Sequence, residues 1–219
     1  MNDPEALIRA NTILTPVCQV PEIRLHLATE ITPIWQATEA WLTENNVAPP
    51  FWAFAWPGGR ALARHMLDHP ELVAGKRVLD FAAGGGIAAI AGALAGAAAV
   101  EAAEIDALAL VAVGMNAAAN GVDVARSGDV VGMACRWDLI VCGDICYEAP
   151  MTGRIMPWLR SMAAVAEVWI ADPGRAYLPA VGLRTLAGYR IETSLELEDS
   201  TYRDVVIYRV GCGVEQGLG

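Results

Sequence analysis

A buried strand that runs straight into a glycine-rich turn constrains this chain more than any other feature. Residues 77–81 are mostly apolar, Ala82-Ala83-Gly84-Gly85-Gly86 follows, and an uncharged helical stretch begins at Ile87. Strand, glycine turn and helix in this order are typical of a parallel sheet covered by helices. Because the order repeats, we predict an α/β fold with an open, doubly wound sheet. The expected strands are 77–81, 99–104, 122–127, 139–142 and 168–171, and the expected helices are 87–95, 108–120 and 154–166.

The C-terminal part departs from this order. Residues 189–197 and 204–210 are β-rich runs joined by the polar link 198–203, which indicates an antiparallel hairpin. The last strands of a typical dehydrogenase stay parallel, so this ending argues for a different class of protein. Residues 211–219 are glycine-rich and are expected to form a flexible tail.

The first fifty residues predict a small accessory region. A helix is expected at 4–13 behind the cap Asp3, a half-buried strand at 23–27 and a second helix at 32–41. A chain of 219 residues suits one hydrophobic core. We therefore expect a single domain of residues 1–219, with an accessory segment at 1–50, a core at 51–210 and a tail at 211–219.

Composition narrows the class of protein. Hydrophobic residues make up 55% of the chain and charged residues 18%, which is enough apolar surface to build a core. The richest apolar stretch, 87–100, is shorter than the roughly 20 residues of a membrane span. No basic segment followed by an apolar core opens the chain, so we expect a cytoplasmic protein with no membrane partner.

Charge and side-chain type exclude further classes. The net charge of −10 and the lack of a basic run argue against nucleic-acid binding. An acidic surface suits a basic partner, although solubility alone also explains it. The five cysteines have no paired C-x-x-C spacing, which fits reduced thiols. His65 and His69 fit a solvated helix face better than a ligand pair, so we expect no metal.

The glycine turn is a candidate ligand site. Small residues at Ala82, Gly84 and Gly86 let a ligand approach the backbone, and the free amides at the start of the following helix favour an anionic group. Open α/β sheets bind nucleotides at such turns. A tight turn without any ligand is the alternative, because a glycine turn alone is a weak signal.

Acidic residues at the ends of two strands strengthen the ligand interpretation. Glu104 lies about 20 residues after the turn, where a carboxylate can accept hydrogen bonds from both ribose hydroxyls of a nucleotide. Ile105 beside it belongs to the same expected site, whereas Asp106 fits a helix N-cap. A dinucleotide oxidoreductase and a methyltransferase both remain possible here. Asp80, which the dinucleotide fingerprint does not contain, favours a ligand with a charged amino group and a sulfonium.

With these residues and the helix that carries Asn116 and Asn120-Gly121, the chain resembles the seven-β-strand S-adenosylmethionine methyltransferases, which implies a Rossmann-like sheet of that kind. Asp144-Ile145-Cys146-Tyr147 resembles the Asp-x-x-Tyr motif of their protein lysine methyltransferase branch. Residues 50–59, PFWAFAWPGG, and 172–175, DPGR, extend the likeness to the electron transfer flavoprotein β-subunit lysine methyltransferase family, bacterial members included. The likeness covers about 49–175; Ala82-Ala83 stands where relatives often have glycine and cysteine.

The resemblance assigns roles to individual residues. Asp144 would hold the lysine amine by a charge-assisted hydrogen bond, Tyr147 would wall the channel, and Trp56 would pack on the cofactor. Trp56 as plain core, and Arg175 in a structural ion pair, are the alternatives. The expected cofactor-binding residues are Trp56, Asp80, Ala82, Gly84, Gly86, Glu104, Ile105, Asp129 beside the adenine amine, and Gly143; the expected substrate-binding residues are Asp172, Arg175 and Tyr177; and the expected catalytic residues are Asp144 and Tyr147.

The activity implied by the resemblance is transfer of a methyl group from S-adenosylmethionine to a lysine of another protein. The electron transfer flavoprotein β-subunit is the implied substrate, and a ribosomal protein is the alternative within the same fold. A dinucleotide-dependent oxidoreductase and a non-catalytic binding module are the alternatives from other classes.

Overall fold

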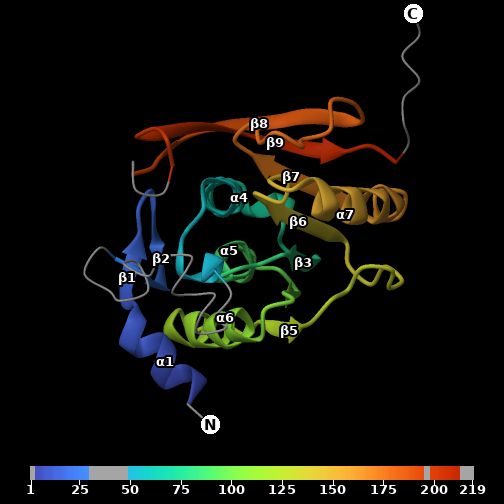
Figure 1. Ribbon diagram of the computed structural model, residues 1–219. Coiled ribbons are helices and arrows are strands. Elements are labelled where there is room, and N and C mark those ends of the chain that lie inside the picture. Colours follow the sequence, from blue (N-terminus) through green and yellow to red (C-terminus); the bar gives the residue numbers. More distant parts are fainter. Residues whose placement is uncertain (1–2, 30–48, 195–197, 213–219) are drawn as a thin grey trace, which may run out of the picture.

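The computed structural model describes residues 3–29, 49–194 and 198–212, and centres on a seven-stranded sheet (Figure 1). Its strands run in the order β5-β4-β3-β6-β7-β9-β8. They are β3 (Arg77–Phe81), β4 (Ala99–Ala103), β5 (Ala125–Ser127), β6 (Leu139–Gly143), β7 (Glu167–Asp172), β8 (Leu183–Glu192) and β9 (Tyr202–Val210). The first five are parallel, and β9 is antiparallel to both β7 and β8. The expected α/β fold with an antiparallel C-terminal hairpin is confirmed.

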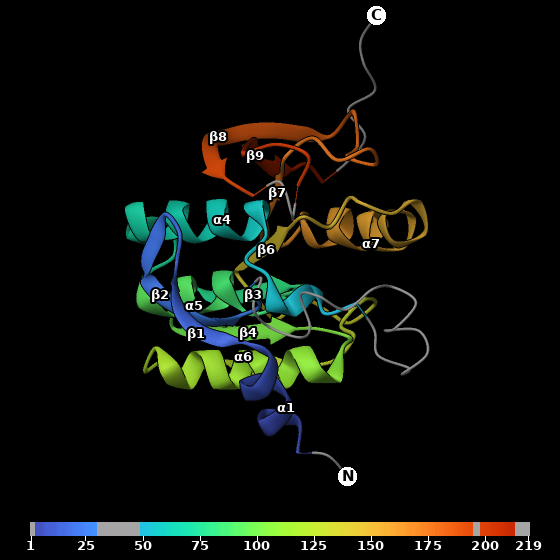
Figure 2. The same cartoon turned by 60° about the vertical axis from the view of Figure 1, so that its left-hand side comes forward.

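Helices cover both faces of the sheet, because strand side chains alternate between two apolar clusters. On one face lie α4 (Pro57–Asp68), α5 (Ile87–Leu94) and α6 (Ala107–Ala119), which pack with strand residues such as Val78 and Val141. On the other face α7 (Ala149–Met162) packs on Leu79 and Ile140. Figure 2 shows α7 across the sheet from α4. The predicted two-sided covering is confirmed.

An N-terminal unit lies beside α6. It consists of α1 (Pro4–Asn11) and an antiparallel hairpin of β1 (Ile13–Val17) and β2 (Val20–Leu27). The expected helix ends two residues early, because the Thr12 hydroxyl donates to the Ile8 carbonyl and the backbone becomes extended. Strand β1, which contains a proline, was not expected. The helix predicted at 32–41 lies outside the described residues.

Several boundaries differ from the sequence prediction for local reasons. Strand β5 starts later than residue 122, because the Val122 amide donates to the Ala117 carbonyl at the end of α6. Helix α7 starts before residue 154, because Pro150 fits its first turn, where a missing N–H costs little. The strand expected at 189–197 is β8, which pairs with β9 from Leu183 onward; residues 195–197 lie outside the described residues.

Helix α4 has no counterpart in the sequence prediction, because it opens with Pro-Gly-Gly, and glycine is a poor helix former. Its His65 is 6% exposed, lies 5.4 Å from the Trp169 ring centre and places Nδ1 2.9 Å from the Tyr189 hydroxyl. The expected solvated helix face is therefore wrong for His65. Two short 3-10 helices, η1 (Phe51–Ala53) and η2 (Pro70–Leu72), flank α4. None of the helices within the described ranges combines the length and apolar character that crossing a bilayer requires.

Candidate active site

The candidate site lies at the carboxyl edge of the parallel strands, where the glycine turn after β3 begins. Ala82, Gly84 and Gly86 adopt left-handed backbone angles, with φ of 58°, 52° and 81°. Gly86 is the N-cap of α5, and a Cβ on the intervening Gly85 would lie 2.8 Å from the Trp52 carbonyl oxygen. The turn therefore requires small residues. Ala82 holds a conformation that costs a non-glycine residue about 1 kcal/mol or more.

Asp80 is the last residue but one of β3, just before this turn, and is 3% exposed. Its carboxylate accepts a hydrogen bond of 2.8 Å from the Ala89 amide in the first turn of α5. Burial raises the pKa of Asp80 to about 7, against the effect of that hydrogen bond, and the nearby Glu104 raises it further. A buried carboxyl with a raised pKa gains from a cationic ligand group, because the cation restores ionisation.

Glu104 joins the glycine turn to the end of β4. Its Oε2 accepts from the Gly84 amide at 3.0 Å, and its Oε1 accepts from the Ile105 amide at 2.7 Å and from the Asp106 amide at 3.3 Å. Ile105 is 77% exposed. Asp106 caps α6 by accepting from the Leu108 amide at 2.8 Å, which confirms its expected structural role.

These residues fit S-adenosylmethionine. At Gly84 a Cβ would meet nothing nearer than 3.8 Å, and two carboxylates stand at the ends of adjacent strands, β3 and β4. Such a pair can bind an amino group and ribose hydroxyls together. Gly143 meets α4 instead of open space, since a Cβ there would lie 2.6 Å from the Gly59 nitrogen. The geometry thus gives Gly143 a packing role beside its expected cofactor role.

Asp144 follows β6 and is the carboxylate nearest the start of α4. Its side chain is 11% exposed, and its backbone is left-handed at φ 56°. The Gly58 amide donates to Oδ2 at 2.6 Å, and the Arg175 Nη2 donates to Oδ1 at 3.3 Å. Burial raises the pKa of Asp144 to about 6, with the charge of Arg175 opposing the shift.

Four aromatic side chains form what we call the aromatic wall: Phe51, Phe54, Trp56 and Tyr147. The Tyr147 ring centre lies 5.9 Å from that of Phe51, which lies 6.1 Å from Trp56. Phe54 stands edge-on to Trp56 at 5.9 Å, and the Trp56 indole N–H donates to the Phe51 carbonyl at 2.8 Å. Phe51 is 50% and Tyr147 43% exposed, whereas Phe54 and Trp56 are half-buried, so one end of the wall reaches the surface.

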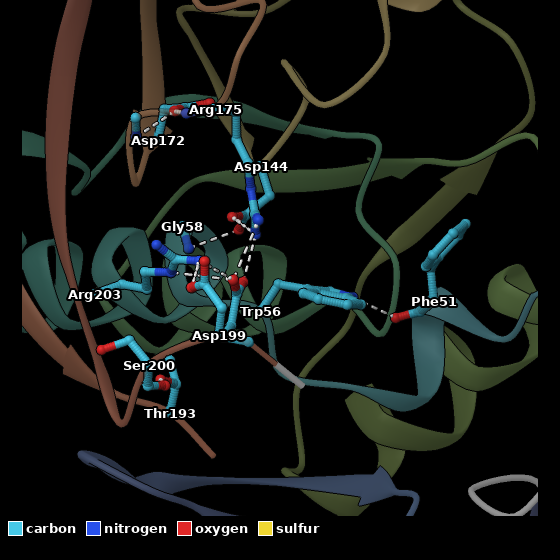
Figure 3. A network of polar contacts seen from close by, with 12 residues as sticks. Phe51, Trp56, Gly58, Asp144, Asp172, Arg175, Thr193, Asp199, Ser200 and Arg203 are labelled. Atoms are coloured by element: carbon cyan, nitrogen blue, oxygen red, sulfur yellow. Dashed lines mark hydrogen bonds and ion pairs between the residues drawn. The ribbon is translucent and has the colours of Figure 1, made fainter. Parts of the chain in front are cut away.

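The loop after β7 carries the residues expected to contact substrate (Figure 3). Asp172 is 1% exposed, and its Oδ1 accepts from the backbone amides of Gly174 at 2.7 Å and Arg175 at 2.6 Å. The Arg175 guanidinium joins Asp144 to Glu198, which the sequence did not single out. Asp172 therefore shapes the turn, and Arg175 takes the ion-pair position that was its alternative reading.

Two other expected site residues lie at the edges of this region. Asp129, after β5, pairs with Arg154 of α7, and its carboxylate accepts from the Val131 amide at 3.0 Å. The hydrogen bond from Arg154 lowers the pKa of Asp129. Tyr177 is 46% exposed, and its amide donates to the Cys146 carbonyl at 3.2 Å. The tyrosine is thereby anchored to the loop that follows Asp144.

Sequence reasoning missed Gly58 and Glu198. A Cβ on Gly58 would lie 2.5 Å from Asp144 Oδ2 and 2.6 Å from the Ala171 carbonyl oxygen, so only glycine lets α4 meet the ends of β6 and β7. The pair Gly58-Gly59 after a proline was the available signal. No signal in the sequence marked Glu198, because an acidic residue in a polar link is typical of a solvated loop.

The comparisons with known proteins agree with this geometry. A family model described as ribosomal protein L11 methyltransferase (PrmA) matches residues 62–146, from α4 to the loop after β6. A solved ribosomal protein L11 methylase from Lactobacillus delbrueckii subsp. bulgaricus is 24% identical, with a TM-score of 0.52 over 72% of this chain and 81% of that one. The magnesium protoporphyrin IX methyltransferase from Synechocystis PCC 6803 with bound SAH is 15% identical, with a TM-score of 0.51 over 70% and 82%. These likenesses support the fold.

Curated relatives show the family. The electron transfer flavoprotein beta subunit lysine methyltransferase of Xenopus laevis is 36% identical over 215 residues, which cover 94% of this chain and 86% of the relative. Its counterpart from Danio rerio is 34% identical over 202 residues, which cover 88% of this chain and 77% of the relative. Similarity at this level extends over 88% and 94% of this chain. The chain therefore belongs to the electron transfer flavoprotein beta subunit lysine methyltransferase family.

Proposed function

We propose that this chain methylates a lysine of the electron transfer flavoprotein beta subunit, with Asp144 and Tyr147 receiving the lysine. Its class, an S-adenosylmethionine-dependent protein-lysine N-methyltransferase, follows from the family. The class also makes the dinucleotide oxidoreductase the weaker reading. The proposal concerns the partner protein and the parts played by individual residues.

The observation that carries the proposal is a largely buried carboxylate whose own loop also carries Tyr147 of the aromatic wall. Asp144 is 11% exposed and holds its two oxygens through Gly58 and Arg175. A lysine side chain entering along Phe51 and Tyr147 reaches this carboxylate with its ammonium group. Aromatic faces attract cations, and they also exclude water from the methylene chain.

The cofactor residues are proposed from the same edge of the sheet. When bound, S-adenosylmethionine supplies an electrophilic methyl group on a sulfonium. Asp80, with its raised pKa, suits the amino group of the methionine arm, and Glu104 suits the ribose hydroxyls. Ala82, Gly84 and Gly86 let the ligand approach the turn, with Trp56, Ile105, Asp129 and Gly143 as the other proposed contacts.

Asp144 has to position an amine that is protonated in water. A lysine has an ordinary pKa of about 10.4, so the ammonium must lose a proton before its nitrogen can attack. Asp144 would attract the ammonium, which would release one proton to solvent water, and the carboxylate would then accept a hydrogen bond from the neutral amine, leaving the nitrogen lone pair free to attack. Correct orientation of two reactants supplies much of the acceleration in such transfers. Asp172, Arg175 and Tyr177 stay proposed contacts at the mouth of this channel.

The experiment incubates the purified chain with labelled S-adenosylmethionine and purified electron transfer flavoprotein. We expect label on a lysine of the beta subunit, located by mass spectrometry. Ribosomal protein L11 is the parallel substrate, because the matched family model carries its name. Label on L11 with none on the beta subunit would replace the proposed substrate. The absence of label on either protein would remove both.

A further inference from the structure

Glu198 is a buried carboxylate close to Asp144 that no motif of the chain contains. It lies in the link between β8 and β9, and its side chain is 4% exposed. Acidic side chains are almost never fully buried unless they are paired. Glu198 is paired twice, with Arg175 from the loop after β7 and with Arg203 from β9.

The Arg175 guanidinium is shared unequally between two carboxylates. Its Nη2 lies 2.6 Å from Glu198 Oε1 and 3.3 Å from Asp144 Oδ1. Its Nη1 adds a second contact to Glu198 at 3.3 Å. Arg175 thus directs both terminal nitrogens at Glu198 and only one, at the longer distance, at Asp144.

Hydrogen bonds in the residues around it hold Glu198 in this place. Its amide donates to the Ser194 carbonyl at 2.9 Å, and the Thr193 hydroxyl donates to the Ser200 carbonyl at 2.5 Å. Arg203 donates to Oε2 of the same carboxylate at 2.9 and 3.1 Å. The loop therefore presents a fixed anion to Arg175.

We propose that Glu198 is a positioning residue that holds the Arg175 guanidinium off Asp144, so that the Asp144 carboxylate stays available to the substrate lysine. This inference rests on the proposed function. Arginine can take both oxygens of a carboxylate in a bidentate pair, which a single ammonium does not match. Without Glu198, Arg175 closes on Asp144 and competes with the substrate.

The charges around Asp144 give the expected direction of its titration. Arg175 faces it from the loop after β7, Asp172 from the end of β7 and the Cys146 thiol from its own loop. Glu198, in the β8–β9 link, pairs with the same Arg175 guanidinium. The Gly58 amide faces it from α4. Loss of the Glu198 charge leaves Arg175 as an unshared cation, and the pKa of Asp144 falls.

The kinetic test compares Glu198→Gln with the double variant Arg175→Gln/Glu198→Gln. We expect Glu198→Gln to raise KM for the protein substrate about tenfold, as the loss of one charge-assisted hydrogen bond would. The double variant returns to the KM of Arg175→Gln alone, because the competing cation is gone. Glu198→Asp keeps the charge and retains most of the activity. If Glu198 has only a structural role, the double variant should have the same raised KM as Glu198→Gln.

A titration of Asp144 tests the role of Glu198 independently of the proposed protein substrate. Carbon-13 labelled aspartate, with Asp144→Asn to assign the signal, reports the pKa of Asp144 without any protein substrate. We expect the pKa to fall in Glu198→Gln and to rise in Arg175→Gln. If wild-type protein labels no substrate, the proposed function fails while this titration still decides the role of Glu198.

Two results would overturn the inference. One is an Asp144 titration that is the same in wild type, Glu198→Gln and Arg175→Gln. The other is a double variant that stays at the KM of Glu198→Gln. Should Glu198→Gln not fold, Arg175→Gln alone suffices, because an unchanged Asp144 pKa there shows that the guanidinium does not govern the carboxylate.

Discussion

Single carboxylates decide the chemistry at the residue scale. Asp80, Asp144 and Asp172 all lie at strand ends, and burial raises the pKa of each, yet their partners differ. Asp80 meets a helix amide, Asp172 meets the amides of its own turn, and Asp144 meets an amide and a guanidinium. Asp144 is therefore the acid of this group whose side chain pairs with a guanidinium and whose loop carries Tyr147 of the aromatic wall.

Asp144→Asn should abolish methyl transfer and spare cofactor binding. The amide keeps the hydrogen bond from Gly58 but attracts no ammonium, so we expect kcat/KM to fall at least about 100-fold, as when a charged, positioned group is lost. Calorimetry with S-adenosylhomocysteine should give an unchanged Kd. Asp204→Asn on β9, whose carboxylate pairs with exposed Arg190, is the matched control and should be active. An active Asp144→Asn would exclude the carboxylate from the reaction.

The pH dependence of wild type follows from the same group. The pKa of Asp144 is about 6, so the carboxylate is ionised above that pH and neutral below it. Deprotonation of the substrate lysine already makes log kcat/KM rise with pH at a slope of about 1. Below pH about 6 the slope should therefore steepen toward 2. A plot that stays straight down to pH 5 would contradict the proposed part of Asp144.

The buried Asp80 carboxyl should lower stability at high pH, although the same group is proposed to bind the cofactor. Its folded pKa of about 7 exceeds the ordinary value of 3.8. Between these values the folded state holds a proton that the unfolded state has lost, so the free energy of unfolding falls as pH rises from 4 to 7. Asp80→Asn should remove this fall and gain on the order of 2–4 kcal/mol at pH 8, while it weakens S-adenosylhomocysteine binding. Urea unfolding at pH 5 and pH 8 measures the first effect. An unfolding free energy that changes equally between these two pH values in wild type and in Asp80→Asn would refute it.

At the scale of elements, the start of α4 is what closes the site. Pro57 and Gly58 bring the helix against the ends of β6 and β7, and the Gly58 amide supplies the hydrogen bond to Asp144. Amides at the start of a helix stabilise negative charge. The helix therefore positions the carboxylate and partly offsets its burial.

Gly58→Ala tests this contact. A methyl group at Gly58 would lie 2.5 Å from Asp144 Oδ2 and 2.6 Å from a backbone oxygen, so α4 has to shift. We expect a loss of about 1–3 kcal/mol in unfolding free energy, as for overpacking, and a lower kcat. Gly153→Ala in α7 is the control, because its Cβ meets nothing within 4 Å. That change should be neutral or stabilising, since alanine favours a helix. Equal effects of the two changes, by thermal unfolding and by rate, would contradict the argument.

At the scale of the whole molecule, the net charge of −10 is the feature available for partner recognition. An acidic enzyme attracts a basic docking surface over about a Debye length, roughly 8–10 Å in ordinary salt. We expect KM for the protein substrate to rise with ionic strength between about 50 and 300 mM while kcat stays constant. Steady-state kinetics in added sodium chloride measures this, and a flat KM would show that the charge serves solubility alone.

The sequence alone determined the parts of the protein that depend on local pattern. The strand 77–81, the turn to Gly86 and the acids at positions 80, 104 and 144 could be read from it, because burial, tight turns and strand ends leave a signature within a few residues. Tertiary structure decided the rest. Helix α4 opens with weak helix formers, so its sequence does not predict a helix. Glu198 has the sequence context of a solvated residue, and only the folded hairpin places it against Arg175. Such partners are about twenty to over eighty residues apart in the chain, and only the packing of the sheet decides which charges meet.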